Sequence, residues 1–135
     1  MDCETIKMEI PANPDYVSIL RLTTSGIANK LGFSMDDIED MKVAVSEAST
    51  NAIKHSDDKT VSITYTILEN GLNIEIKDNG KGYDVDSIAT PDLTQPKENG
   101  LGLFIIQTLR DEVEIESKDN QGTIIKMTKY LGVDI

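Results

Sequence analysis

The sequence is poor in aromatic residues and in cations. It has no tryptophan, two phenylalanines and four tyrosines, so its core must be built mainly from aliphatic side chains. Only 13 lysines and arginines stand against 24 aspartates and glutamates, which gives a formal net charge of −11. Such a surface repels nucleic-acid phosphates, and no local basic patch offsets it. The composition therefore disfavours direct nucleic-acid binding and favours a partner protein with a basic surface.

Several other features are missing. The single cysteine, Cys3, cannot form an internal disulfide, and we interpret it as a surface thiol. No apolar run resembles a signal peptide or approaches the length of a membrane span. A Walker loop, GxxxxGK[ST], does not occur, and no GxGxxG motif links a strand to a helix. We therefore expect a cytoplasmic protein of one domain, residues 1–135, with no membrane segment.

Hydrophobic periodicity predicts a strand, two helices, a hairpin, a long loop, a third helix and a second hairpin. The expected ranges are strand 5–10, helices 14–31 and 34–55, strands 61–68 and 72–78, helix 101–110, and strands 112–117 and 123–130. Gly32 suits the end of the first helix, Ser34 the N-cap of the second, and Asn70-Gly71 a hairpin turn. This order predicts an α+β fold: a two-layer sandwich with a mixed, mostly antiparallel sheet and about three helices on one face.

The predicted helix 34–55 carries a row of polar residues. Glu47, Asn51 and His55 follow at four-residue intervals and share one slanted face. The buried side is marked by Ile38, Met41, Val45, Ala48 and Ala52. At about 100° per residue, Glu47 lies roughly 130°, Asn51 roughly 90° and His55 roughly 50° from the centre of that side. The row thus approaches the core edge, where a ligand pocket would lie. The alternative is a solvated flank with a half-buried histidine.

Two glycine-containing segments flank the long loop. Asp78-Asn79-Gly80-Lys81-Gly82 follows a predicted strand, where a carboxylate accepts hydrogen bonds from an amino group and glycines admit a ring or a phosphate. Asn99-Gly100-Leu101-Gly102-Leu103 opens the predicted third helix, whose free amides suit phosphate. The alternatives are an ordinary turn and close helix packing. Residues 79–100 between them have no clean period, and a loop of this length in a small domain is usually functional or mobile.

The three motifs occur in a fixed order: ExxxNxxxH on a helix, DxGxG after a strand, and GLGL opening a helix after a long loop. That order resembles the GHKL ATP-binding family, which includes gyrase, the Hsp90 chaperones, histidine kinases and MutL. The resemblance implies the GHKL ATP-binding fold, with ATP and Mg²⁺ as ligands and an ATP lid at about residues 83–99.

A narrower resemblance covers nearly the whole chain. Residues 10–55, the stretch LRDEVEIES and the closing MTKYL are similar to RsbW-type anti-sigma factors, which are serine-protein kinases. This resemblance implies a protein that holds a sigma factor away from RNA polymerase. It also implies that Mg-ATP is used to phosphorylate a serine on an anti-sigma-factor antagonist, and that the chain is a homodimer.

The resemblance implies roles for residues of the two helices. Glu47 is expected to accept the proton of the attacking serine hydroxyl, and Asn51 to supply an oxygen to Mg²⁺. Arg21, within ILRLT, matches the arginine that contacts the protein partners, and its alternative is an ordinary surface cation. His55 is expected to be structural.

The remaining implied residues contact the nucleotide. Asp78 would bind the adenine amino group, and Gly80 and Gly82 would line the adenine ring. The residues expected to approach the phosphates share the start of the third helix: Gly100, Leu101 and Gly102.

Two other functions remain open. A histidine-kinase ATPase domain needs a phosphoacceptor histidine, and the only histidine here, His55, lies inside the nucleotide motif. An ATP-gated clamp on a sigma factor, with little kinase activity, would need nucleotide binding but no general base. The presence of Glu47 favours the kinase over the clamp.

Overall fold

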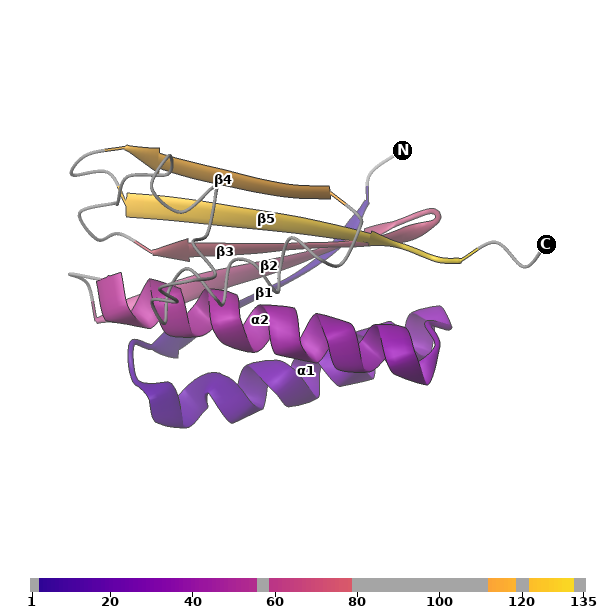
Figure 1. Ribbon diagram of the computed structural model, residues 1–135, viewed down its shortest axis with the longest axis horizontal. Coiled ribbons are helices and arrows are strands. Elements are labelled where there is room, and N and C mark those ends of the chain that lie inside the picture. The colour runs from indigo at the N-terminus through magenta and orange to yellow at the C-terminus, as the bar shows by residue number, and fades with distance from the viewer. Residues whose placement is uncertain (1–2, 56–58, 79–111, 119–121, 133–135) are drawn as a thin grey trace, which may run out of the picture.

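The computed structural model describes residues 3–55, 59–78, 112–118 and 122–132. In that part of the chain, a five-stranded sheet carries two α-helices on one face (Figure 1). The elements are β1 (Glu4–Pro11), the 3-10 helix η1 (Pro14–Tyr16), α1 (Val17–Leu31), α2 (Met35–His55), β2 (Thr60–Leu68), β3 (Gly71–Asp78), β4 (Glu112–Lys118) and β5 (Gly122–Tyr130). The predicted α+β sandwich is confirmed. The expected third helix, 101–110, lies outside the described residues.

The strand order is β1-β2-β3-β5-β4, and every pairing in the described residues is antiparallel. The sequence had suggested a mixed, mostly antiparallel sheet. In the described residues the sheet is antiparallel throughout. Alternate residues of each strand face the helices, and the buried ones are Ile10, Val61, Ile63, Tyr65, Leu72, Ile74, Ile76, Ile125 and Met127. Mostly aliphatic side chains thus fill the layer between sheet and helices, as the composition predicted.

Local signals end α1 and begin α2. Gly32 has φ 92°, and its N–H donates to the carbonyls of Ala28 and Asn29. The next residue, Phe33, is buried and also donates its N–H to the Ala28 carbonyl, at 3.2 Å. The Ser34 hydroxyl then accepts from the Asp37 N–H at 3.1 Å, which satisfies a free amide of the first turn of α2. The predicted helix end and N-cap are both confirmed.

The hairpin between β2 and β3 forms where Asn70-Gly71 predicted it, but Gly71 has a different role. Leu68 pairs with Gly71, so Glu69 and Asn70 form the loop and Gly71 is already a strand residue. A Cβ at Gly71 would collide with the Lys129 carbonyl oxygen of β5. The glycine is therefore needed for close approach of two strands and not for the turn.

A buried polar contact ties α1 to the sheet. The hydroxyls of Thr24 and Tyr65 lie 2.8 Å apart, and neither side chain is exposed. The Tyr65 hydroxyl also lies 3.5 Å from the Leu20 carbonyl oxygen. Burial raises the pKa of Tyr65, while the hydrogen bond from Thr24 lowers it by less. A directional bond in an otherwise apolar layer sets how α1 is rotated on the sheet.

The face of the sheet away from the helices is polar. One row across all five strands consists of Lys7, Thr64, Glu75, Lys126 and Glu114. Lys126 lies 3.7 Å from Glu116, and the Asn73 amide donates to the Thr128 hydroxyl at 2.9 Å. Opposite charges and an amide–hydroxyl hydrogen bond make this face suited to water and not to a dry interface.

Candidate functional site

The row predicted on α2 lies at the edge of the core. Asn51 is buried, with 5% of its surface exposed, and Glu47 one turn earlier is half-buried. The sequence had placed Asn51 on a flank of the helix. Asn51 lies on the side of α2 that faces the sheet, because it follows Ala44 by seven residues and so lies about 20° from it around the helix, and Ala44 lines a pocket together with Val113 and Met127. The side chain of His55 lies outside the described residues.

Asn51 has an unsatisfied amide. Its Nδ2 is buried and has no hydrogen-bond partner within the described part of the chain. A buried donor without a partner costs about 1–3 kcal/mol, so such groups are rare and are typical of ligand sites. The oxygen and nitrogen of an amide are interchangeable by a half-turn, so the same position offers either a donor or an oxygen ligand.

Three hydroxyls near this row do not compete for a ligand. Ser46 donates to the Lys42 carbonyl at 2.8 Å, and Ser49 donates to the Val45 carbonyl at 2.6 Å. Thr50 donates to the Ser46 carbonyl at 2.7 Å. Because these hydroxyls bond to the backbone of their own helix, Glu47 and Asn51 are the polar groups of this stretch that are left for chemistry.

Asp78 is the last residue of β3, and its carboxylate is buried, with 2% exposed. In the β3–β5 register it lies opposite Thr123, which is equally buried. Thr123 follows Gly122, whose φ of 81° closes the β4–β5 hairpin. We had not predicted Thr123 as a site residue. One signal in the sequence could have indicated it. Thr123 is two residues before Ile125 and four before Met127, so it faces the same side of the strand, but it carries a hydroxyl among apolar side chains.

These residues come together at one end of the molecule. The C-terminal ends of α2 and β3 and the start of β5 lie at the same end of the two layers, on the left of Figure 1. Asn51, Asp78 and Thr123 belong to those ends. The site therefore combines a carboxylate and a hydroxyl from the sheet with an amide and a second carboxylate from the helix.

Other predicted site residues lie outside the described residues. These are Gly80, Gly82, Gly100, Leu101 and Gly102, together with the expected lid at 83–99. Their roles stay predictions.

Arg21 is exposed on α1. Figure 1 shows that α1 begins at the same end of the molecule as the site, and Arg21 lies in its first half. The structure does not bring Arg21 together with Glu47 or Asn51 in any contact within the described residues. The position suits a group that faces a protein partner.

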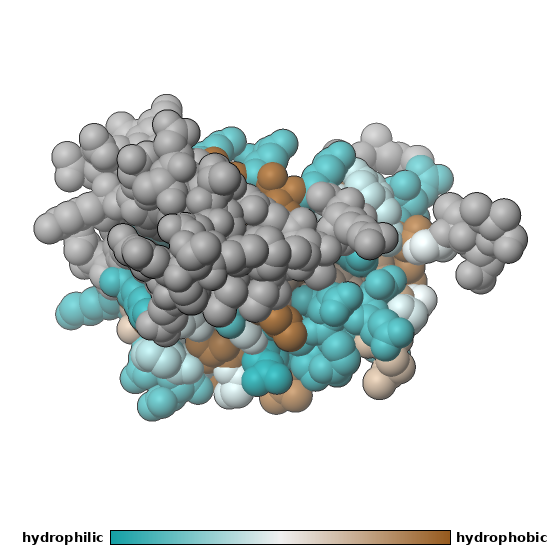
Figure 2. All heavy atoms as spheres, in the orientation of Figure 1, coloured by the Kyte–Doolittle hydropathy of each residue, from teal (hydrophilic) through white to brown (hydrophobic). Residues whose placement is uncertain are grey.

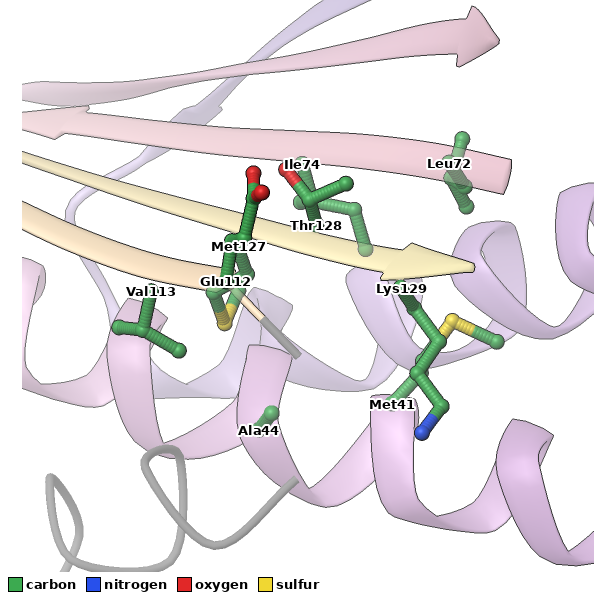
Figure 3. Close-up of a pocket in the computed structure, with 9 residues that line it drawn as sticks. All are labelled: Met41, Ala44, Leu72, Ile74, Glu112, Val113, Met127, Thr128 and Lys129. Carbon is green, nitrogen blue, oxygen red and sulfur yellow. The ribbon is translucent and has the colours of Figure 1, made fainter. Parts of the chain in front are cut away.

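A small pocket lies elsewhere along α2. Val113, Met127 and Lys129 point from the sheet toward Met41 and Ala44 of the helix, while the Glu112 carboxylate points away (Figure 3). None of the predicted site residues lines this pocket. Its walls are mainly apolar, and we assign the site to the polar groups at the other end of α2 and β3.

The polar groups fit a magnesium nucleotide. Mg²⁺ prefers oxygen ligands and is usually held by one or two protein groups together with phosphates and water. Within the described residues no group of three histidine, cysteine, aspartate or glutamate side chains could hold a metal by itself. One amide at Asn51, with its unsatisfied atom, therefore fits an ion that the nucleotide brings with it. No helix in the described residues is long and apolar enough to cross a membrane.

Residues 10–129 match the family model described as the histidine kinase-like ATPase domain. A serine-protein kinase RsbW of Halalkalibacterium halodurans is 43% identical over 97% of this chain and 86% of that protein. Serine-protein kinases RsbW of Bacillus cereus and Bacillus anthracis are 42% identical over 95% of this chain and 86% of each protein.

Solved structures share the fold. A Mycobacterium tuberculosis structure of RsbU and RsbW domains superposes with a TM-score of 0.71 at 17% identity, and covers 95% of this chain. This chain spans only 32% of that longer chain. The histidine kinase domain of an Erythrobacter litoralis blue-light activated histidine kinase gives a TM-score of 0.59 at 18% identity, over 90% of this chain and 62% of that chain.

Proposed function

This chain belongs to the histidine kinase-like ATPase domain family and, within it, to the RsbW serine-protein kinases. We propose that it uses ATP to phosphorylate a serine of an antagonist protein. We further propose that it sequesters an RNA polymerase sigma factor in the cytoplasm and releases it when unphosphorylated antagonist binds. The observation that carries the proposal is the pair on α2: a half-buried Glu47 one turn before a buried Asn51 with an unsatisfied amide.

Glu47 is the proposed general base. When the serine oxygen bonds to the γ-phosphorus and the bond from phosphorus to the ADP oxygen breaks, the serine proton passes to a Glu47 oxygen. A half-buried carboxylate suits this role because it is reachable by a substrate but is partly shielded from water. The helix holds it one turn from Asn51, so base and ligand group keep a fixed spacing.

Asn51 and Asp78 are the proposed ligand-binding groups. Asn51 supplies an amide oxygen to Mg²⁺, which when bound neutralises charge on the phosphates. The buried carboxylate of Asp78 accepts a hydrogen bond from the adenine amino group and excludes a base that presents an oxygen there. Burial of both groups supports selective recognition because a mismatched ligand would leave them unpaired.

The test is phosphate transfer by Glu47→Ala. Labelled ATP is incubated with the purified antagonist and wild type, Glu47→Ala, or the control Asp40→Ala, which alters an exposed carboxylate on the same helix. We expect transfer to fall by on the order of 10²–10⁴ in Glu47→Ala, with ATP and sigma-factor binding retained, and to stay normal in Asp40→Ala. Near-normal transfer by Glu47→Ala would remove the base assignment. A wild type that binds ATP and sigma factor but transfers no phosphate would instead indicate an ATP-gated clamp.

A further inference from the structure

A line of three residues along α2 faces β5. Asp37, Ala44 and Asn51 follow one another at seven-residue intervals, and seven residues turn an α-helix through about 20° less than two full turns. The three side chains therefore lie within about 40° of one direction. Asp37 and Asn51 are polar and lie near the two ends of α2, whereas Ala44 in the middle is buried and apolar.

The inward side of β5 repeats this arrangement. It begins at Thr123 and ends at Lys129, and the two inward residues between them are buried and apolar. The strand and α2 run in opposite directions, so that β5 ends where α2 begins (Figure 1). The 14 residues from Asp37 to Asn51 span about 21 Å of helix, and the six from Thr123 to Lys129 span about 20 Å of strand. The polar ends of helix and strand therefore fall at the same two levels.

An ion pair joins helix and strand where α2 begins. Lys129 points from β5 toward α2 (Figure 3), and its Nζ lies 3.8 Å from Oδ1 of Asp37. The side chains are 16% and 30% exposed, so the pair lies at the border of the buried layer. Figure 2 shows that the described surface at this end, on the right where α2 begins, is mostly hydrophilic. The backbone of Asp37 is held as well, because its N–H donates to the Ser34 hydroxyl at 3.1 Å. Lys129 is thus paired with a fixed point of the helix.

The middle of the line does not fix α2 along the strand. A small pocket lies between Met41 and Ala44 of the helix and Val113 and Met127 of the sheet (Figure 3). Side chains that enclose a gap do not interlock, and alanine has no atom beyond Cβ that could obstruct sliding. Apolar burial is also non-directional. A directional contact at one end is therefore needed to set where the helix lies along β5.

We propose that the Lys129–Asp37 ion pair sets the position of α2 along β5 and thereby holds Asn51 level with Asp78 and Thr123 at the other end. This rests on the proposed function, which assigns the helix groups to the phosphates and the sheet groups to the base. Both sets must engage one ATP molecule, and a misplacement of about 1 Å can cost roughly 10²-fold in rate. Lys129 and Asp37 are then positioning residues, which act through α2 and do not touch the substrate.

The test removes the charge on each side of the pair. Lys129→Met keeps the length of the side chain and suits the apolar pocket beside it, and Asp37→Asn keeps the shape of the carboxylate. Lys126→Met is the matched control, because Lys126 forms an ion pair of 3.7 Å on the outer face of the sheet. Glu39→Gln is the control on α2, since Glu39 pairs within the same helix at 3.0 Å.

Mg-ATP affinity is measured by calorimetry, and phosphate transfer is measured to the antagonist protein that wild type phosphorylates. We expect Lys129→Met and Asp37→Asn each to lower kcat by roughly 10-fold or more and to weaken Mg-ATP, with the KM for the antagonist unchanged. The double variant should be no slower than the slower single variant, because either change alone removes the pair. Lys129→Arg should retain most of kcat. Urea midpoints should stay near wild type, since a partly exposed pair contributes little stability.

Normal kcat in Lys129→Met and Asp37→Asn would overturn this positioning role while leaving the proposed function intact. An equal loss in Lys126→Met or Glu39→Gln would also overturn it, because the effect would then be one of charge in general. A wild type that binds Mg-ATP but transfers no phosphate would overturn the proposed kinase. The position of α2 is then tested by Mg-ATP affinity, which should fall in Lys129→Met but not in Lys126→Met, and equal affinities would overturn the positioning role too.

Discussion

Asp78 and Thr123 lie directly opposite each other in the β3–β5 register, and each is only 2% exposed. The two residues come from strands whose sequence positions are far apart, because residues 79–121 separate β3 from β5. A carboxylate and a hydroxyl at one buried position of a sheet form a polar spot in an apolar layer. This pair forms the sheet side of the site that we propose for the nucleotide base.

Asp78→Asn should lose affinity for the adenine base. An amide at this position can present a donor where the adenine amino group needs an acceptor. Loss of a hydrogen bond to a charged group corresponds to about 1.5–3 kcal/mol, or roughly 10- to 150-fold in affinity. Calorimetry with ATP and GTP measures it, with Lys77→Ala as the control because Lys77 is exposed on the other face of β3. Unchanged ATP affinity and unchanged preference over GTP would remove Asp78 from the site.

Asn51→Leu should separate stability from ligand binding. The Nδ2 of Asn51 has no partner to lose, so an apolar side chain of similar size should unfold at no lower a denaturant concentration than wild type. Affinity for ATP in the presence of Mg²⁺ should fall, since leucine offers no oxygen ligand. Urea unfolding and calorimetry with and without Mg²⁺ give the two readouts. A variant that is less stable but binds Mg-ATP normally would make Asn51 a structural residue.

Arg21→Ala should weaken both protein partners and leave ATP binding unchanged. An exposed arginine on an acid-free helix can make a bidentate pair with a carboxylate, which lysine cannot copy. If that pair is desolvated, its loss costs roughly 2–5 kcal/mol for each partner. Binding of Arg21→Ala and Arg21→Lys to sigma factor and antagonist is measured separately. Lysine should not restore full affinity, and normal binding of Arg21→Ala to both proteins would make this residue only a surface charge.

Tyr65→Phe should reduce stability near neutral pH and change its alkaline dependence. Removing the hydroxyl deprives Thr24 of its partner at 2.8 Å, which costs about 1–2 kcal/mol. Burial raises the pKa of Tyr65 in the folded state, so its contribution is full below the unfolded value of about 10 and is lost as pH rises through the folded value. The wild type should therefore lose more stability above pH ~10 than Tyr65→Phe does.

Urea unfolding from pH 7 to 11 checks this, with Tyr16→Phe as the control at an exposed tyrosine. Thr24→Val and the double variant complete a cycle that isolates the pair. Parallel pH curves for wild type and Tyr65→Phe would contradict the burial argument.

Local patterns predicted the described elements well because their causes are local. Alternation gave the strands of both hairpins to within about two residues, and Gly32 and Ser34 set the boundary between the helices through their own backbone and side-chain bonds. The strand order could not be predicted in the same way. β3 pairs with β5, from which it is separated by residues 79–121, and nothing in either strand alone specifies that neighbour.

The site was predicted only in part for the same reason. Glu47 and Asn51 follow from helical spacing, but the burial of Asn51 could not be predicted, because the side of α2 that faces β5 is set by packing between distant segments. Thr123 was missed because its position opposite Asp78 depends on a pairing between distant segments. The only signal in the sequence that could have marked Thr123 as a site residue was a hydroxyl at an inward-facing position after Gly122.

The place of β1 in the sheet has a consequence for the order of folding during synthesis. β1 precedes both helices in the sequence and pairs with β2, so that Glu4 meets Ile67 only after both helices have left the ribosome. Until then its inward residues Ile6, Met8 and Ile10 have no strand beside them. The α1–α2 pair and the β2–β3 hairpin close over short stretches of chain, whereas β1 must wait for a distant partner. The pairing of β1 is thus completed after the helix pair has been made but before the pairings of β5 with β3 and β4.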